Sequence, residues 1–168
     1  MIRATAAQLN RGRDFGGNPL GGTPPAGTGF TVGTGFEPEA VNPERELDCL
    51  RAKIDAGADY VMTQPVFDRA ALSTIDTLRN SIAVMPGVMV LRSSDHARRI
   101  ARVPGVNLPT TILDELDRFD QAADQAKVGL DLAVAQALSH KSEGWPGLYL
   151  MSPASLGAAA GVLKALVE

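Results

Sequence analysis

Short apolar runs alternate with amphipathic helical patterns along most of this 168-residue chain, and that alternation limits the fold more than any other feature. Strand-like runs occur at residues 30–36, 59–64, 82–91 and 147–151, and a helical pattern follows each of them. This order, with short connections, is typical of an α/β fold with a parallel sheet and right-handed crossovers. We therefore expect four parallel strands in a single domain over residues 1–168.

Local signals mark where several of these elements begin and end. Asn42 is a good N-cap and Pro43 fits the first helical position, while Gly57 supplies a stop for the same helix. The next run, residues 59–64, is apolar with little alternation, which is typical of a strand covered on both faces. Ser94 is expected to cap a later short helix.

The two ends of the chain differ in character. Residues 1–10 have the apolar spacing of the tail of a helix, and residues 16–29 are dominated by glycine and proline, which predicts a loop before the first strand. A long helix is expected over residues 120–141 and an Ala-rich final helix over residues 155–167. His140 lies beside a lysine where the long helix ends, so we expect it to face solvent.

Composition excludes several classes of protein. The net charge of −3 disfavours nucleic acid as a partner. Cys49 is the only cysteine, so an internal disulfide framework is excluded, and with His96 and His140 as the only histidines no histidine metal cluster is expected. No apolar run approaches the roughly 20 residues of a membrane span, and the N-terminus lacks an apolar signal core. We expect a cytoplasmic protein with no membrane partner.

The expected strand ends mark where chemistry belongs. In parallel α/β folds, ligands bind at the carboxyl ends of the strands. That rule selects four short segments, at residues 35–37, 63–65, 86–92 and 151–153.

These segments, in this order, resemble the methylenetetrahydrofolate reductase family. The strongest stretch is AGADYVMTQPVFD, whose Thr-Gln segment follows a strand as it does in the family. The similarity is closest to reductase modules of the kind also fused to homocysteine methyltransferases. The matching stretches are residues 9–20, 30–40, 56–68, 85–109 and 147–153, which resemble the family's barrel from the loop before strand five to strand eight.

The resemblance implies a partial TIM (β/α)8 barrel, roughly strands 5–8 with their helices. It also implies FAD-mediated hydride transfer from NADH or NADPH to methylenetetrahydrofolate, which gives methyltetrahydrofolate. By the same resemblance, Gln64 contacts the folate pterin ring and Arg92 and His96 contribute folate contacts. The alternatives are a glutamine that caps a strand terminus, a surface arginine and a histidine at a helix start.

Five further positions match residues that hold FAD in the family. The resemblance implies that Glu46 and Lys53 lie near the ribose and phosphates, that Glu37 and Ala40 lie on the adenosine side, and that Thr34 lets the flavin ring approach. A cation near a pyrophosphate is physically sensible. The alternatives are an ordinary solvated helix face for Glu46 and Lys53 and a plain loop for the others.

Two departures from the family bear on activity. The family's catalytic glutamate and flavin-tuning aspartate both precede the position matched by Leu9, so we assign no catalytic residue here. The arginine that meets folate after strand eight has no counterpart, and Leu156 lies in that segment. We expect a reductase fragment that needs the missing N-terminal half. Alternatively, the chain is a non-catalytic flavin- or folate-binding half-barrel.

Four strands cannot close a barrel, and an eight-stranded barrel needs about 250 residues. We therefore expect the chain either to form a homo-oligomer or to bind a complementary N-terminal half-barrel. A third reading, a pterin-dependent methyltransferase half-barrel, is opposed by the FEPEA segment and the Thr-Gln segment.

Overall fold

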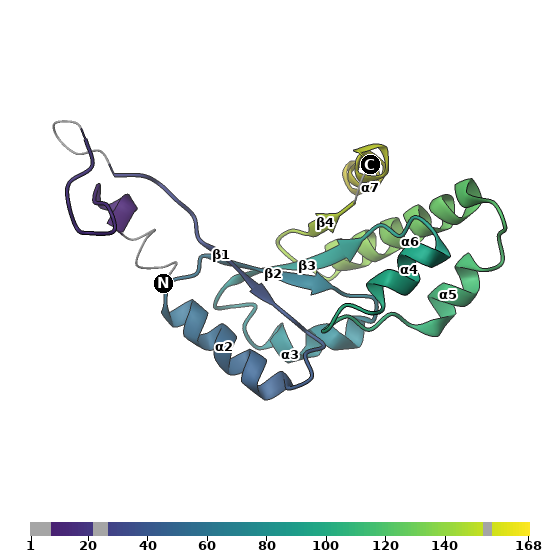
Figure 1. Cartoon of the computed structure of the whole chain (residues 1–168), viewed down its shortest axis with the longest axis horizontal. Helices are drawn as coiled ribbons and strands as arrows, with labels where there is room; N and C mark the ends of the chain where they lie inside the picture. The colour runs from purple at the N-terminus through teal and green to yellow at the C-terminus, as the bar shows by residue number, and fades with distance from the viewer. Residues whose placement is uncertain (1–7, 22–26, 153–155) are drawn as a thin grey trace.

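The computed structural model describes residues 8–21, 27–152 and 156–168. Within them, four strands form one parallel sheet whose strand order, β1-β2-β3-β4, equals the chain order (Figure 1). The elements are β1 (Gly33–Phe36), α2 (Pro43–Asp55), β2 (Tyr60–Pro65), η1 (Arg69–Leu72), α3 (Ser73–Asp76), β3 (Ala83–Met89), α4 (Ser94–Ile100), α5 (Thr110–Leu116), α6 (Ala122–Ser142), β4 (Tyr149–Met151) and α7 (Leu156–Val167). The predicted α/β fold with a parallel sheet is confirmed, and it is consistent with a partial TIM-barrel-like fold.

The ends of the chain agree with the expected pattern where they are described. Residues 8–10 are helical, and the rest of the helical tail expected over 1–10 lies outside the described residues. Residues 16–21 and 27–29 of the expected loop contain no helix or strand, and its residues 22–26 also lie outside. None of the helices in the described part of the chain has both the length and the apolar character that crossing a bilayer requires.

Side-chain caps fix two helix starts. The Asn42 side chain accepts a hydrogen bond from the Arg45 backbone N–H at 3.0 Å, which confirms Asn42 as the N-cap of α2. The expected cap of α4 was wrong by one residue, because Ser93, not Ser94, accepts from the His96 backbone N–H at 3.1 Å. Ser93 has extended backbone angles, as an N-cap residue requires, whereas Ser94 is already helical.

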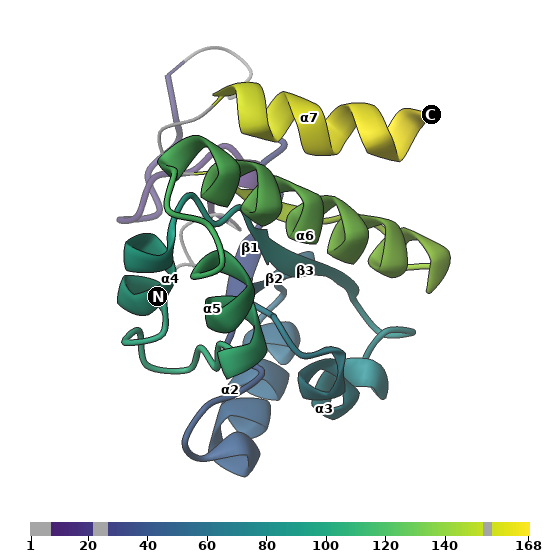
Figure 2. The ribbon, with the colours of Figure 1, turned by 90° about the vertical axis from the view of Figure 1, so that its right-hand side faces the viewer.

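The helices pack on one face of the sheet. Figure 1 shows α2 and α3 along one side of the sheet with α6 and α7 further round, and Figure 2 shows α7 lying beside α6. Three apolar clusters join the helices to the strands. The cluster that includes α2 and α3 contains Leu50, Val61, Ile75 and Val84. The cluster that includes α6 and α7 contains Val88, Ala133, Ala137 and Val162. The cluster that includes α4 and α5 contains Leu91, Ala97, Leu108 and Leu116.

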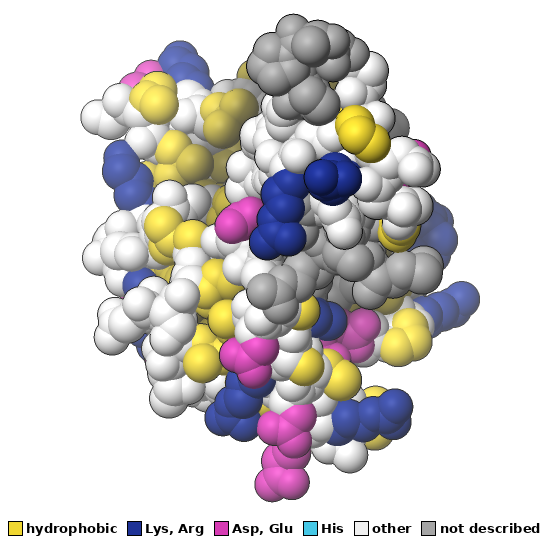
Figure 3. Space-filling view, turned by 90° about the vertical axis from the view of Figure 1, so that its left-hand side faces the viewer, with side chains coloured by type: hydrophobic (Ala, Val, Ile, Leu, Met, Phe, Trp, Pro, Cys, Tyr) yellow, Lys and Arg dark blue, Asp and Glu magenta, His cyan; other side chains and the backbone are white. Residues whose placement is uncertain are grey.

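The other face of the sheet is open, and the expectation that β2 is covered on both faces was wrong. Burial alternates along the strand: Val61, Thr63 and Pro65 are buried, and the residues between them are only half-buried. No described helix contributes to an apolar cluster on that second face. Figure 3 shows hydrophobic side chains at the surface along a hollowed strip of the molecule. A half-barrel has this shape, because its inner face is covered only when the barrel closes.

A bulge interrupts the pairing of β2 with β3. The register changes between Met62 and Pro65, so that β2 holds one residue more than β3 over this stretch. The Thr63 hydroxyl fills the break: it accepts from the Gly87 backbone N–H and donates to the Gln64 carbonyl, both at 2.8 Å. A side chain at Gly87 would not fit, since its Cβ would lie 2.6 Å from the Gln64 carbonyl oxygen.

The end of α6 buries His140, so the expectation that this residue faces solvent was wrong. The helix ends at Ser142, and Gly144, with a φ of 75°, then turns the chain back on itself. Trp145 then donates its backbone N–H to the His140 carbonyl, and its indole meets the His140 ring edge-on at 6.5 Å. The sequence around His140 is polar, but the returning tryptophan covers it.

Candidate functional site

A hollow of about 360 Å³ lies where the carboxyl ends of β1 and β2 meet α2 and β4. Side chains or backbone from these four elements line it, and they include Gly35, Glu37, Glu46, Lys53, Gln64, Tyr149 and Met151. It therefore occupies the edge of the sheet where the parallel fold predicts a ligand.

Gln64 reaches this hollow through the bulge. The residue before it, Thr63, is 2% exposed and holds the bulge by its two hydrogen bonds. Gln64 itself is half-buried and lines the hollow. An amide presents a donor and an acceptor in one plane, so Gln64 can pair with a planar heterocycle that offers the reverse pattern.

A polar network ties the start and end of α2 to the end of β1. Lys53 donates to the Gly35 carbonyl at 2.9 Å, and its ammonium lies 3.9 Å from the Glu46 carboxylate. The same carboxylate accepts from the Glu37 backbone N–H at 3.2 Å. These contacts hold the Lys53 ammonium and the Glu46 carboxylate along one wall of the hollow.

This wall fits one part of a dinucleotide cofactor. An ammonium has three donors and Lys53 uses one on Gly35, which leaves donors for a phosphate oxygen. Carboxylates such as Glu46 repel phosphate but accept hydrogen bonds from ribose hydroxyls. Gly35 has open space where a Cβ would be, so a flat ring can approach its backbone. Pockets for drug-sized ligands run to about 1,000 Å³, so this smaller hollow would cover only part of FAD.

The structure brings four of the eight predicted site residues together at the hollow, and they are Glu37, Glu46, Lys53 and Gln64. The other four do not line it. Thr34 precedes Gly35 in β1, so its side chain lies on the opposite face of the strand from that of Gly35. Ala40 lies in the turn after β1, where its backbone N–H donates to the Glu37 carbonyl. Arg92 and His96 lie beyond the end of β3.

His96 has a structural partner in its own turn. Its Nδ1 accepts from the Arg92 backbone N–H at 3.3 Å, and the residue is 6% exposed. Burial lowers the pKa of its imidazole, and the positive charges of Arg92 and Arg99 lower it further. A neutral ring suits the acceptor role that Nδ1 plays here.

The segment after β4 is only partly described. Leu156, in the segment where the family has an arginine, begins α7 and is 92% exposed, while residues 153–155 lie outside the described residues. The described residues contain no cluster of three or more metal-ligating side chains.

The strand-end rule had selected the segments that contain Thr63 and Met151, but sequence reasoning gave neither residue a role and left out Tyr149. Thr63 positions Gln64, and Tyr149 and Met151 form the wall opposite α2. The usable signal for the β4 pair was alternation, since Tyr149 and Met151 are two residues apart and must share a face. The bulge at Thr63 had no local signal, because it depends on the register of a strand more than 20 residues away.

Comparison with known proteins supports the fold and the family. The sequence profile described as Methylenetetrahydrofolate reductase matches residues 31–166. A solved structure has a TM-score of 0.51 at 14% identity, covering 81% of this chain and 52% of that one. It is described as an uncharacterized protein from Clostridium thermocellum that binds two copies of 5-methyl-5,6,7,8-tetrahydrofolic acid.

Curated relatives agree. The chain is 28% identical over 145 residues to "Probable methylenetetrahydrofolate reductase (NADPH)" of Caenorhabditis elegans, covering 82% of this chain and 21% of that protein. It is 28% identical over 107 residues to 5,10-methylenetetrahydrofolate reductase of Escherichia coli, covering 58% of this chain and 34% of that protein. The chain thus spans about a third or less of these relatives' length. With its profile match over most of its residues, the chain belongs to the methylenetetrahydrofolate reductase family.

Proposed function

We propose that this chain forms the carboxyl-terminal half of a methylenetetrahydrofolate reductase barrel, and that it binds the folate substrate and part of FAD at the hollow described above. The observation that carries the proposal is the convergence of Gln64, Glu37, Glu46 and Lys53 at the carboxyl ends of the strands. FAD, when bound, would supply the redox chemistry that moves hydride from NAD(P)H to methylenetetrahydrofolate. Of the chain's own residues, Lys53 would hold a phosphate, Glu46 a ribose and Gln64 the pterin.

Reduction itself would need the preceding half of the barrel. The family's catalytic acid matches no position in this chain, and the inner face of the sheet lacks cover from any described helix. A complementary half-barrel would supply both. A cytoplasmic location stays an expectation from the sequence.

Folate binding is tested with 5-methyltetrahydrofolate, the ligand named for the Clostridium thermocellum protein. Calorimetric titration of the full chain with 5-methyltetrahydrofolate should show saturable binding. Gln64→Ala should weaken binding about tenfold, since two hydrogen bonds to the ligand are worth roughly 1 to 2 kcal/mol net. The matched control is Gln121→Ala, because Gln121 is exposed at the start of α6 and its side chain makes no capping bond there. Equal affinities for the two variants would refute the assignment.

FAD binding is tested separately, by absorbance after mixing the chain with FAD and removing free flavin. The chain should retain flavin, and Lys53→Met should lose it more readily than Lys127→Met, which alters an exposed lysine on α6. A chain that retains no flavin under any condition would remove FAD from the proposal. Steady reductase turnover by the chain alone would contradict the need for the missing half.

The open sheet face favours a second candidate, a non-catalytic folate- or flavin-binding half-barrel that self-associates. Tyr149, on the edge strand β4, is 40% exposed, and β1 and β4 are both edges without a further strand in the described residues. Light scattering would separate the two candidates. A stable dimer that binds folate and has no reductase activity with any added half-barrel would favour the second.

A further inference from the structure

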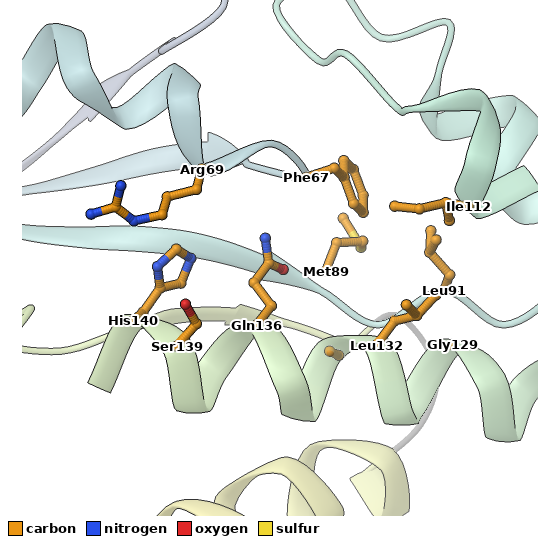
Figure 4. Close-up of a pocket in the computed structure, with 11 residues that line it drawn as sticks. Phe67, Arg69, Met89, Leu91, Ile112, Gly129, Leu132, Gln136, Ser139 and His140 are labelled. Atoms are coloured by element: carbon orange, nitrogen blue, oxygen red, sulfur yellow. The ribbon is translucent and has the colours of Figure 1, made fainter. Parts of the chain in front are cut away.

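A second cavity lies away from the hollow, in the layer between α6 and the sheet. Its volume is about 210 Å³. Figure 4 shows its lining side chains beside α6, with Ile112 of α5 at one end and His140 of α6 at the other. All its walls come from residues 67–140, on the side of the sheet that the helices cover. Completion of the barrel would therefore leave it unchanged.

The cavity has an apolar body and one polar end. Its apolar walls include Phe67, Met89, Leu91, Ile112 and Leu132. At the polar end, most groups already have partners. Gln136 donates its amide to the Val66 carbonyl, and Ser139 and Arg69 both donate to the Glu143 carboxylate.

His140 is the exception at this end. It is 2% exposed, and neither Nδ1 nor Nε2 has a hydrogen-bond partner. Burial lowers its pKa, an effect that Arg69 reinforces and Glu143 opposes, so the ring is neutral at neutral pH and carries one donor and one acceptor. A buried polar group left without a partner is destabilising, and a bound molecule can recover that loss by hydrogen bonding.

The surroundings select a neutral ligand. The Glu143 carboxylate, which accepts from Nε of Arg69 at 2.6 Å, would repel an anion. The Arg69 guanidinium would repel a cation. A hydroxyl can donate to one imidazole nitrogen or accept from the other without adding charge. A cavity of about 150 Å³ is known to hold benzene, so the volume here suits a ring that carries one polar substituent.

We propose that this cavity is a second binding site, distinct from the hollow at the strand ends, for a small neutral molecule with an aromatic or aliphatic body and a hydroxyl directed at His140. The inference does not depend on the proposed reductase function.

The test uses the isotope-labelled full chain and two probes, phenol and toluene, which differ in the hydroxyl. Phenol should shift the His140 ring and Leu132 methyl signals with saturation, and toluene should bind at least fivefold more weakly because it leaves the imidazole without a partner. In His140→Phe, phenol should lose this advantage over toluene. Equal affinity of the unchanged chain for the two probes, or shifts that never saturate, would overturn the proposal.

A matched pair of variants locates the site. Leu132→Trp should fill the apolar body and abolish phenol binding. Leu138→Trp, the same change at a position on α6 that is 41% exposed and does not line the cavity, should leave binding intact. Phenol binding that survives Leu132→Trp unchanged would refute the location, and the probe comparison on the unchanged chain would still decide the hydroxyl preference if either variant misfolds.

Discussion

Removal of the Thr63 hydroxyl should loosen the bulge that positions Gln64. In Thr63→Val the shape of the side chain is kept, but the Gly87 backbone N–H loses the acceptor it meets at 2.8 Å. Gly87 and Thr63 are both buried, so water does not replace the hydroxyl. An unsatisfied buried donor costs about 1 to 3 kcal/mol, and the added methyl group recovers roughly 0.8 kcal/mol by burial. We expect a net loss of about 1 kcal/mol in the free energy of unfolding.

Urea unfolding at one fixed protein concentration measures that loss. With a slope of about 2 kcal/mol per molar urea, the midpoint should fall by roughly 0.5 M. Hydrogen exchange gives the specific readout, because the Gly87 amide should exchange about tenfold faster while amides in α6 change only with global stability. The variant should also bind 5-methyltetrahydrofolate more weakly, because the Thr63 hydroxyl no longer holds the Gln64 backbone.

Thr63→Ser is the matched control for this prediction. It keeps the hydroxyl and both hydrogen bonds but loses a buried methyl group, which costs about 0.8 kcal/mol. Global stability should therefore fall by a similar amount in the two variants, whereas protection of the Gly87 amide should survive only in Thr63→Ser. The reasoning fails if Thr63→Val retains Gly87 protection, because the hydroxyl would then not hold the bulge.

Three further predictions concern stability. Gly129→Ala should destabilise the chain by about 1 to 2 kcal/mol in urea unfolding, because the added Cβ would lie 1.9 Å from the Leu91 carbonyl oxygen. This clash outweighs the gain of about 1 kcal/mol in helix propensity. Gly161→Ala is the control: its Cβ would meet only a leucine side chain, at 3.3 Å, so the change should be neutral or stabilising. Asn42→Ala should cost about 1 kcal/mol through loss of the α2 cap, and an unchanged melting temperature would contradict that role. Because burial lowers the pKa of His140, the unfolded chain binds its proton first, so stability should be full near pH 8 and fall as pH drops below about 6.5. Burial also lowers the pKa of His96, so His140→Phe should reduce that dependence, without abolishing it, when unfolding is followed across pH.

The alternation of strands and helices was predictable because it rests on local patterns. Asn42 and Gly57 mark the ends of α2 through their own conformational preferences, and the structure confirms both. The position of the α4 cap was harder, since Ser93 and Ser94 have equal propensity and only the exact end of the preceding extended segment separates them.

What the sequence could not predict depends on contacts between distant segments. The burial of His140 requires Gly144 to turn the chain and Arg79, from the segment before β3, to lie 3.8 Å above the Trp145 ring. The open face of β2 depends on what else packs against the sheet, which no pattern within one strand reveals. Within the site, the residues on α2 and β2 were found by resemblance, and their mutual contacts came only from the structure.

The sheet has a consequence for how such a unit is assembled. Because each strand pairs with the strand before it in the chain, the order of synthesis is also the order in which strands can be added to the sheet. A strand can then be added at either edge without breaking an existing pair. The proposed half-barrel could in this way be extended by a second set of strands, on the same chain or on a separate one.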